Sequence, residues 1–210
     1  MVTVIITSHN QEESLRCSLP VYLSQSYSDY DVIVVDKNSE DMTVRWLEDM
    51  ELEHTHLSHI LLPASTKANN KDVMALLLGI RHCLSERIII ASADCVPQSE
   101  HWLEDVMSAW DDTTKIVVVP EVARKYKDAK SLRLSFRQKY ALWLLRHGMP
   151  RCSISSVLGI ERSVFLSCRL LNNRVKSKLR TSDLLVRYCS TPLNTSVLKD
   201  AKYSVYSLVP

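Results

Sequence analysis

Short runs of β-branched apolar residues recur along the first 120 residues, and each run ends in polar or acidic residues. The runs at Val2–Thr7, Val32–Val35 and Ile88–Ile90 alternate little between apolar and polar residues. Such continuous runs are typical of strands that are buried on both faces of a parallel sheet. Two more runs, at 59–65 and 115–119, predict a further pair of strands.

Segments with helical spacing of their apolar residues separate these strands. Gln11–Gln25 is predicted to be a helix that is kinked near Pro20, and Asn69–Leu84 is predicted to be a second helix. Ser39 and Ser99 are plausible starting points for two more helices. Strands that alternate with helices in this way predict an α/β fold, a doubly wound and mostly parallel sheet with helices on both faces.

Two carboxylates follow predicted strands. Asp36 comes directly after Val35, and Asp94 follows the run Ile88–Ile90 by a few residues, just before Pro97 prevents the strand from continuing. The carboxyl ends of parallel strands meet at one edge of the sheet, where open α/β sheets bind their ligands. The sequence therefore predicts that Asp36 and Asp94 face one crevice. The alternative for each residue is an ordinary acidic loop position.

Charge divides the chain into two unlike parts. Residues 1–114 carry 7 basic and 19 acidic residues, whereas residues 115–210 carry 19 basic and 5 acidic ones. A basic excess suits phosphorylated ligands or an anionic membrane surface, and it also suits attraction between the two parts. We find no aromatic-interleaved RNA motif or helix-turn-helix, so no nucleic-acid partner is predicted.

The second part has a different pattern of elements. Ala129–Arg146 has the spacing of an amphipathic helix, and the basic stretch 124–146 is the segment that an anionic membrane surface would attract. A strand at 155–160 and helices at 162–167 and 181–188 are predicted after it.

Scattered cysteines and the apolar profile favour a cytoplasmic protein, peripheral at most at the inner face of the membrane. The six cysteines show no C-x-x-C spacing, as is typical of reduced and mostly buried thiols. No apolar run approaches the roughly 18 residues of a membrane span, and the start of the chain lacks the features of a signal peptide.

Three segments together resemble the donor-binding half of family 2 glycosyltransferases with the GT-A fold. They read VTVIITSHNQEESL, VIVVDKNSEDMT and IIIASADCVPQSEHWL in this sequence. The later segments LGIERSVFL and TSDLLVRY are similar to acceptor-side segments of that family. The resemblance implies a single domain over residues 1–210, with a nucleotide-sugar-binding half at 1–120 and a basic acceptor-side half at 121–210.

The family's site residues can be transferred to matching positions in this sequence. Thr7 and Ser8 would lie under the nucleotide, and Asp36 would accept a hydrogen bond from the base, usually uracil. Asp94 matches the second acid of the Asp-x-Asp metal loop, and Asp183 lies closest to the family's position for the catalytic base. The resemblance implies an inverting transfer of a sugar from a nucleotide donor, with UDP-sugars favoured, to a glycan or lipid-linked acceptor, as in cell-surface polysaccharide biosynthesis.

Three positions depart from the family pattern. Ser92 replaces the first acid of the metal loop, Lys37 stands where a second Asp is common, and Thr181-Ser182 occupies the place of Glu-Asp. We therefore expect Mg²⁺ or Mn²⁺ to bind at Asp94 only together with the donor diphosphate, with Lys37 and Ser92 as donor-binding residues. The alternative is a catalytically weakened or inactive relative that serves as a binding or scaffold protein.

Overall fold

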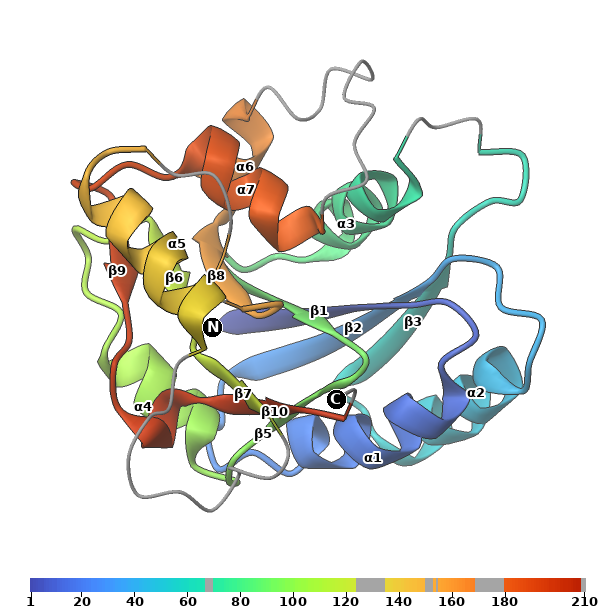
Figure 1. The fold of residues 1–210 in the computed structure, drawn as a ribbon. Coiled ribbons are helices and arrows are strands. Elements are labelled where there is room, and N and C mark those ends of the chain that lie inside the picture. Colours follow the sequence, from blue (N-terminus) through green and yellow to red (C-terminus); the bar gives the residue numbers. More distant parts are fainter. Residues whose placement is uncertain (67–69, 124–134, 150–152, 154, 169–179, 209–210) are drawn as a thin grey trace.

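A computed structural model describes residues 1–66, 70–123, 135–149, 153, 155–168 and 180–208. Its centre is a seven-stranded sheet with the order β3-β2-β1-β4-β8-β6-β9 (Figure 1). The strands of this sheet are, in that order, Leu57–Leu61, Tyr30–Asp36, Val2–Ser8, Arg87–Ser92, Leu158–Glu161, Ile116–Val118 and Thr195–Val197.

Four of the strand pairs are parallel, which confirms the mostly parallel α/β sheet. The parallel pairs are β1 with β2, β1 with β4, β2 with β3, and β6 with β9. Strand β8 runs antiparallel between β4 and β6. Strand β8 comes from residues 121–210 and pairs with strands from residues 1–120, so both parts of the chain build one sheet.

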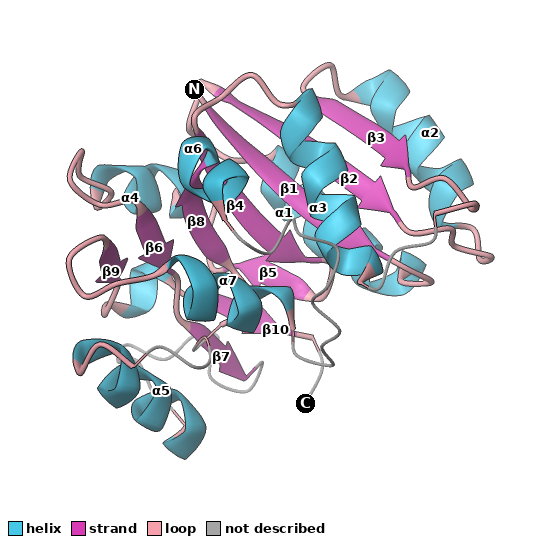
Figure 2. Cartoon of the chain, turned by 90° about the horizontal axis from the view of Figure 1, so that it is seen from above, coloured by secondary structure: helices cyan, strands magenta, loops and turns pink. Residues whose placement is uncertain are grey.

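Helices cover both faces of the sheet, as the sequence predicts. Helices α1, α2 and α4 lie on one face, and α3, α6 and α7 lie on the other (Figures 1 and 2). A further helix, α5, packs Ala141 into the core on the α3 side. The bounds of the helices are Glu12–Leu23 for α1, Thr43–Glu53 for α2, Lys71–His82 for α3, Trp102–Ser108 for α4, Phe136–Arg146 for α5, Arg162–Ser167 for α6 and Thr181–Cys189 for α7.

Successive side chains of the central strand β1 point to opposite faces of the sheet, and the core therefore has two layers. Val4 and Ile6 of β1 pack with α1, α2 and α4, whereas Ile5 between them packs with α3. Successive side chains of a strand point to opposite faces, so a strand that is covered on both faces must be apolar throughout. This is the physical reason for the uninterrupted apolar runs.

A second, three-stranded sheet lies beside the first and was not predicted. Its strands are β5 (Cys95–Pro97), β10 (Val205–Ser207) and β7 (Glu121–Ala123), in that order. Each strand has only three residues, which is too short for a periodicity that the sequence could reveal. A short 3₁₀ helix at Ala201–Tyr203 precedes β10.

Two predicted helix starts are wrong. Helix α2 begins at Thr43 with Met42 as its N-cap residue, and the Ser39 hydroxyl donates a hydrogen bond to Asp36. Helix α4 begins at Trp102, three residues after Ser99. Helix α5 begins at Phe136 with Ser135 in a capping box, and residues 129–134 of the predicted helix lie outside the described residues.

Within the described ranges, no helix has the length and apolar character that crossing a bilayer requires. Cys17, Cys83, Cys95 and Cys189 form no disulfide, and Cys83, Cys95 and Cys168 are buried. Cys152 lies outside the described residues.

Candidate active site

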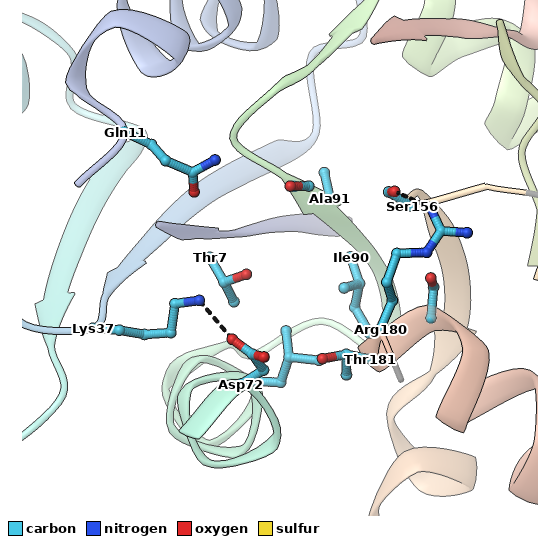
Figure 3. A pocket seen from close by; sticks show the side chains of 12 residues that line it. Thr7, Gln11, Lys37, Asp72, Ile90, Ala91, Ser156, Arg180 and Thr181 are labelled. Carbon is cyan, nitrogen blue, oxygen red and sulfur yellow. Dashed lines mark hydrogen bonds and ion pairs between the residues drawn. The ribbon is translucent and has the colours of Figure 1, made fainter. Parts of the chain in front are cut away.

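A pocket of about 220 Å³ opens at the carboxyl ends of β1, β2 and β4 (Figure 3). Thr7 near the end of β1, Lys37 directly after β2 and Ser92 at the end of β4 line it. These residues are distant in the sequence. The parallel register brings them together, because Ser8 pairs with Asp36 and Thr7 pairs with Ser92 across the sheet. This is the edge of an open α/β sheet at which ligands bind.

Lys37 forms an ion pair across one end of the pocket. Its Nζ lies 2.5 Å from Oδ1 of Asp72, which is in the first turn of α3 and also lines the pocket. The side chain of Lys37 is mostly buried, whereas that of Asp72 is about half exposed. The ammonium group is therefore held at the pocket wall, where it can still meet a ligand oxygen.

Asp36 is fully buried and is not among the residues that line the pocket. Its carboxylate accepts hydrogen bonds from the backbone N–H of Ser39, at 2.8 Å, and from the Ser39 hydroxyl. The Ser39 hydroxyl also accepts a hydrogen bond from the backbone N–H of Asn10. Asn10 and Asn38 have positive φ angles of 51° and 62°, a region in which asparagine is enriched. Asp36 therefore ties together the turns that follow β1 and β2.

Ser8 is likewise buried behind the pocket. Its backbone carbonyl accepts a hydrogen bond from the N–H of Lys37 at 2.9 Å. Its hydroxyl has no hydrogen-bond partner among the described residues.

Asp94 lies in the turn between β4 and β5 and is partly buried. Its backbone carbonyl accepts a hydrogen bond from the N–H of Leu208 at 2.9 Å, so the end of the small sheet fixes this turn. Asp94 does not line the pocket.

Burial raises the pKa of the neighbouring Cys95 thiol well above its usual range, and the nearby carboxylates of Glu121 and Asp94 raise it further. Cys95 is therefore a neutral thiol in the metal-free protein.

The same carboxylates affect the pKa of Tyr22. Burial raises the pKa of its phenol well above the usual value, and Cys95, Asp94 and Glu121 add to the effect. The phenol thus stays neutral.

Asp183 is buried in the first turn of α7, with 2% of its surface exposed. Its Oδ1 accepts a hydrogen bond from the backbone N–H of Ser153 at 2.7 Å. Its Oδ2 lies 3.3 Å from Arg137 Nη2 and 3.6 Å from Arg180 Nε. Asp183 does not line the pocket, although the preceding Ser182 does.

The far wall of the pocket contains residues that the sequence did not reveal as site residues. Ser156, just before β8, and Arg180, at the N-cap of α7, line it, and Arg180 Nη1 donates to Ser156 Oγ at 2.9 Å (Figure 3). Gln11 and Asp72 contribute from the side of α1 and α3. The only available signal for Arg180 was its position directly before a predicted helix.

The family scan and this geometry agree. The family model "Glycosyl transferase family 2" matches residues 3–165, which is most of the chain. The chain belongs to the family 2 glycosyltransferases. Among curated protein sequences, none is detectably similar to it.

Solved structures of glycosyltransferases share the GT-A fold with this chain. The mannosyltransferase PcManGT from Pyrobaculum calidifontis, in complex with GDP-Man and Mn²⁺, aligns with a TM-score of 0.68 and 19% identity over 100% of this chain. TarS 1-349 from S. aureus aligns with a TM-score of 0.68 and 14% identity over 98% of this chain. The same TarS protein in complex with UDP-GlcNAc aligns with a TM-score of 0.65 and 16% identity. This chain spans only 57–60% of the length of these structures.

Proposed function

We propose that the chain binds a nucleoside diphosphate sugar in the pocket and transfers the sugar, with inversion, to a glycan or lipid-linked acceptor. The observation that supports this most is the pocket itself, which lies at the carboxyl ends of β1, β2 and β4 in a family 2 glycosyltransferase fold. The solved relatives contain GDP-Man or UDP-GlcNAc, and we favour a UDP-sugar for this chain. We further propose that the protein acts in the cytoplasm.

In this proposal the ends of β1 and β2 bind the donor nucleotide. Thr7 offers a hydroxyl at the pocket wall, and Ser8 lies behind it. Asp36 takes part by holding the turn that carries Lys37, through its hydrogen bonds to Ser39. Lys37 and Ser92 offer a cation and a hydroxyl to the donor.

Asp183 is the proposed base that deprotonates the acceptor hydroxyl. The carboxylate follows directly after two residues of the pocket wall, Thr181 and Ser182. Arg137 and Arg180 pair with the carboxylate and hold it in position.

The described residues offer a divalent ion only one carboxylate in the metal loop. No group of three or more His, Cys, Asp or Glu side chains that could hold a metal occurs in the part of the chain that the structure describes. Mg²⁺ is commonly held by one or two carboxylates together with substrate phosphates. Asp94, two residues after the pocket-lining Ser92, is the proposed protein ligand once the diphosphate is present. A bound ion would neutralise the negative charge that develops on the departing diphosphate.

We expect Mn²⁺ or Mg²⁺ to bind the protein only in the presence of a nucleoside diphosphate. Titration of Mn²⁺ into the free protein should give no saturable heat, and titration in the presence of UDP should. Asp94→Ala should abolish the second signal, while Asp112→Ala, an exposed acid outside the site, should retain it. Tight Mn²⁺ binding by the free protein would contradict a site with one protein carboxylate.

The transferase activity can be tested by a donor screen. Purified protein is incubated with UDP-, GDP-, CDP- and dTDP-sugars in the presence of Mg²⁺ or Mn²⁺, and both binding and release of the nucleoside diphosphate are measured. The proposed activity requires release from at least one donor and its loss in Asp94→Ala. If no donor binds, the proposal is wrong.

One observation favours a non-catalytic relative as the second candidate. Among the described residues that line the pocket, Asp72 is the one carboxylate, and it is paired with Lys37. A scaffold protein of this kind would bind a nucleotide in the same screen but release no product from any donor.

The described part of helix α5 supports a peripheral contact with an anionic membrane. Phe136, Tyr140 and Trp143 are exposed and share one face of the helix, and the rings of Tyr140 and Trp143 stack. Lys139 and Arg146 are exposed on the same helix. Exposed aromatic and basic side chains are typical of helices that lie in a membrane interface.

Vesicle sedimentation tests this contact. The protein should bind vesicles with anionic lipid at low salt and dissociate as salt is added, because the attraction is screened within a Debye length of about 8–10 Å. Trp143→Ala should weaken binding, whereas Leu52→Ala, an exposed apolar residue on α2, should not. Absence of binding at low salt would contradict the proposal. Residues 124–134 of the predicted basic stretch lie outside the described residues.

A further inference from the structure

The wall of the pocket at the start of α7 has the chemistry of an oxyanion site. We infer that Arg180, Ser182 and the first backbone amides of α7 bind an anionic oxygen group, a phosphate or a carboxylate, of a ligand in this pocket. The inference deepens the proposed function, because it names what the ligand must carry at this wall. Directly after Arg180 the sequence has Thr181 and Ser182, where the family resemblance leads one to expect Glu and Asp.

The N-terminus of α7 is open toward the pocket. The helix has nine residues, and its N-cap residue Arg180 makes no side-chain capping hydrogen bond. The first intrahelical bond runs from the N–H of Leu184 to the carbonyl of Arg180, so the preceding amides have no partner within the helix. Thr181 and Ser182, which carry two of these amides, line the pocket. An anion in the pocket would meet both the amides and the positive end of the helix dipole.

The buried hydroxyl of Ser182 is a second and independent indication of a ligand at this wall. Only 4% of the residue is exposed, and its Oγ has no hydrogen-bond partner among the described residues. Buried hydroxyl groups are nearly always paired, so an unpaired one is a sign of a missing partner. Because Ser182 lines the pocket, a ligand can supply that partner.

Arg180 places a positively charged guanidinium group at the same wall of the pocket. Its side chain is 39% exposed, and the hydrogen bond to Ser156 fixes its orientation (Figure 3). A guanidinium group has five N–H donors in a planar fork that fits phosphate and carboxylate oxygens in pairs. The hydrogen bond to Ser156 engages one of them, which leaves donors for a ligand.

Two acids pair with Arg180, Asp183 at 3.6 Å and Glu121 at 4.0 Å, and both have other donors. Asp183 is bound by the N–H of Ser153 and by Arg137, and Glu121 is bound by the N–H of Ser156 at 2.7 Å. Neither carboxylate lines the pocket. They hold the guanidinium group in place without closing the face that it presents to the cavity.

Two sources could supply the anionic group. One is the diphosphate of a nucleotide donor, and the other is a phosphate or carboxylate on the acceptor or on the transferred sugar. Both have oxygens that suit an arginine fork and helix amides, so they differ only in the molecule that carries the group.

Calorimetric titration in metal-free buffer tests the inference with defined probes. Inorganic pyrophosphate, UDP, glycerol 1-phosphate and uridine are titrated into the wild-type protein and into Arg180→Gln, Ser182→Ala and Arg187→Gln. Arg187 is the matched control, because it is an exposed arginine on the same helix, away from the pocket. Pyrophosphate should bind the wild-type protein about tenfold or more tightly than Arg180→Gln, and a few-fold more tightly than Ser182→Ala. Arg187→Gln should match the wild-type protein.

Ser182→Ala keeps the test decisive if Arg180→Gln fails to fold. It removes a hydroxyl that has no described partner, so its thermal midpoint should equal that of the wild-type protein while its affinity for pyrophosphate falls. A loss that is seen with UDP as well as pyrophosphate assigns the site to the donor diphosphate. A loss that is confined to glycerol 1-phosphate assigns it to the acceptor or sugar.

Failure of the inference differs from failure of the proposed function. If UDP-sugars bind and turn over but Arg180→Gln and Ser182→Ala match the wild-type protein with every anionic probe, the function stands and the inference is wrong. If pyrophosphate binds in an Arg180-dependent way but no nucleotide sugar binds, the inference stands without the function. Absence of binding by any anionic probe to the wild-type protein overturns the inference.

Discussion

Replacement of Asp183 by alanine is expected to lower the free energy of unfolding by about 1–3 kcal/mol, the usual cost of leaving a buried hydrogen-bond donor without its partner. The Asp183 carboxylate is almost fully buried, and it is the shared acceptor for the N–H of Ser153, for Arg137 and for Arg180. Its loss would leave a buried N–H without a partner and two arginines without their counter-charge. Urea denaturation followed by circular dichroism measures the effect.

A matched control is Asp112→Ala, because Asp112 is paired with Arg87 at 2.7 Å but its side chain is fully exposed. That variant should leave the denaturation midpoint unchanged, since exposed ion pairs contribute little. A wild-type midpoint for Asp183→Ala would show that the buried network does not stabilise α7.

Asp183→Asn separates the structural role from the proposed catalytic one. The amide keeps the size of the side chain and one oxygen acceptor for the N–H of Ser153, so most of the fold stability should remain. A general base needs a carboxylate, and its contribution to rate is typically 10²–10⁴-fold. A folded Asp183→Asn protein with full turnover would remove Asp183 from the catalytic step.

Local pattern and simple topology predicted which strand ends meet at one edge of the sheet. Thr7, Lys37 and Ser92, which were named from the family resemblance, lie at or just past such ends and line the pocket. That rule locates positions along the edge, but it does not determine side-chain direction. Asp36 follows its strand as expected, yet its carboxylate turns to Ser39, three residues later, and is closed off from the pocket.

The rest of the site depends on contacts that no local pattern encodes. Ser156 and Arg180 reach the pocket because β8 inserts antiparallel between β4 and β6, and because α7 then begins beside Ser156. The sequence of a short strand does not reveal its direction or the strands with which it pairs. Arg180 is recognisable as a site residue only when its partners Ser156 and Asp183 are known.

The insertion of β8 leads to a second prediction with a large expected effect. Gly159→Ala should lower the free energy of unfolding by about 1–3 kcal/mol, because it forces extra volume into a packed core. A Cβ atom at Gly159 would lie 2.6 Å from Cζ3 of the Trp110 ring and 3.0 Å from its Cη2. The ring cannot easily move aside, since it is 2% exposed and its Nε1 donates to the carbonyl of Thr114 at 2.8 Å. Thermal and urea denaturation measure the loss.

A double-mutant cycle identifies the ring as the cause. Trp110→Phe removes the part of the ring that a Cβ atom at Gly159 would meet, although it leaves a cavity and destabilises the protein by itself. If the clash with Trp110 causes the loss, the protein with both substitutions should be more stable than the sum of the two single losses predicts, with a coupling of about 0.5–3 kcal/mol. Simple additivity would locate the cost of Gly159→Ala elsewhere in β8. Because Ser156 lies two residues before β8, a shift of the strand should also weaken pyrophosphate binding at Arg180 in the single Gly159→Ala variant.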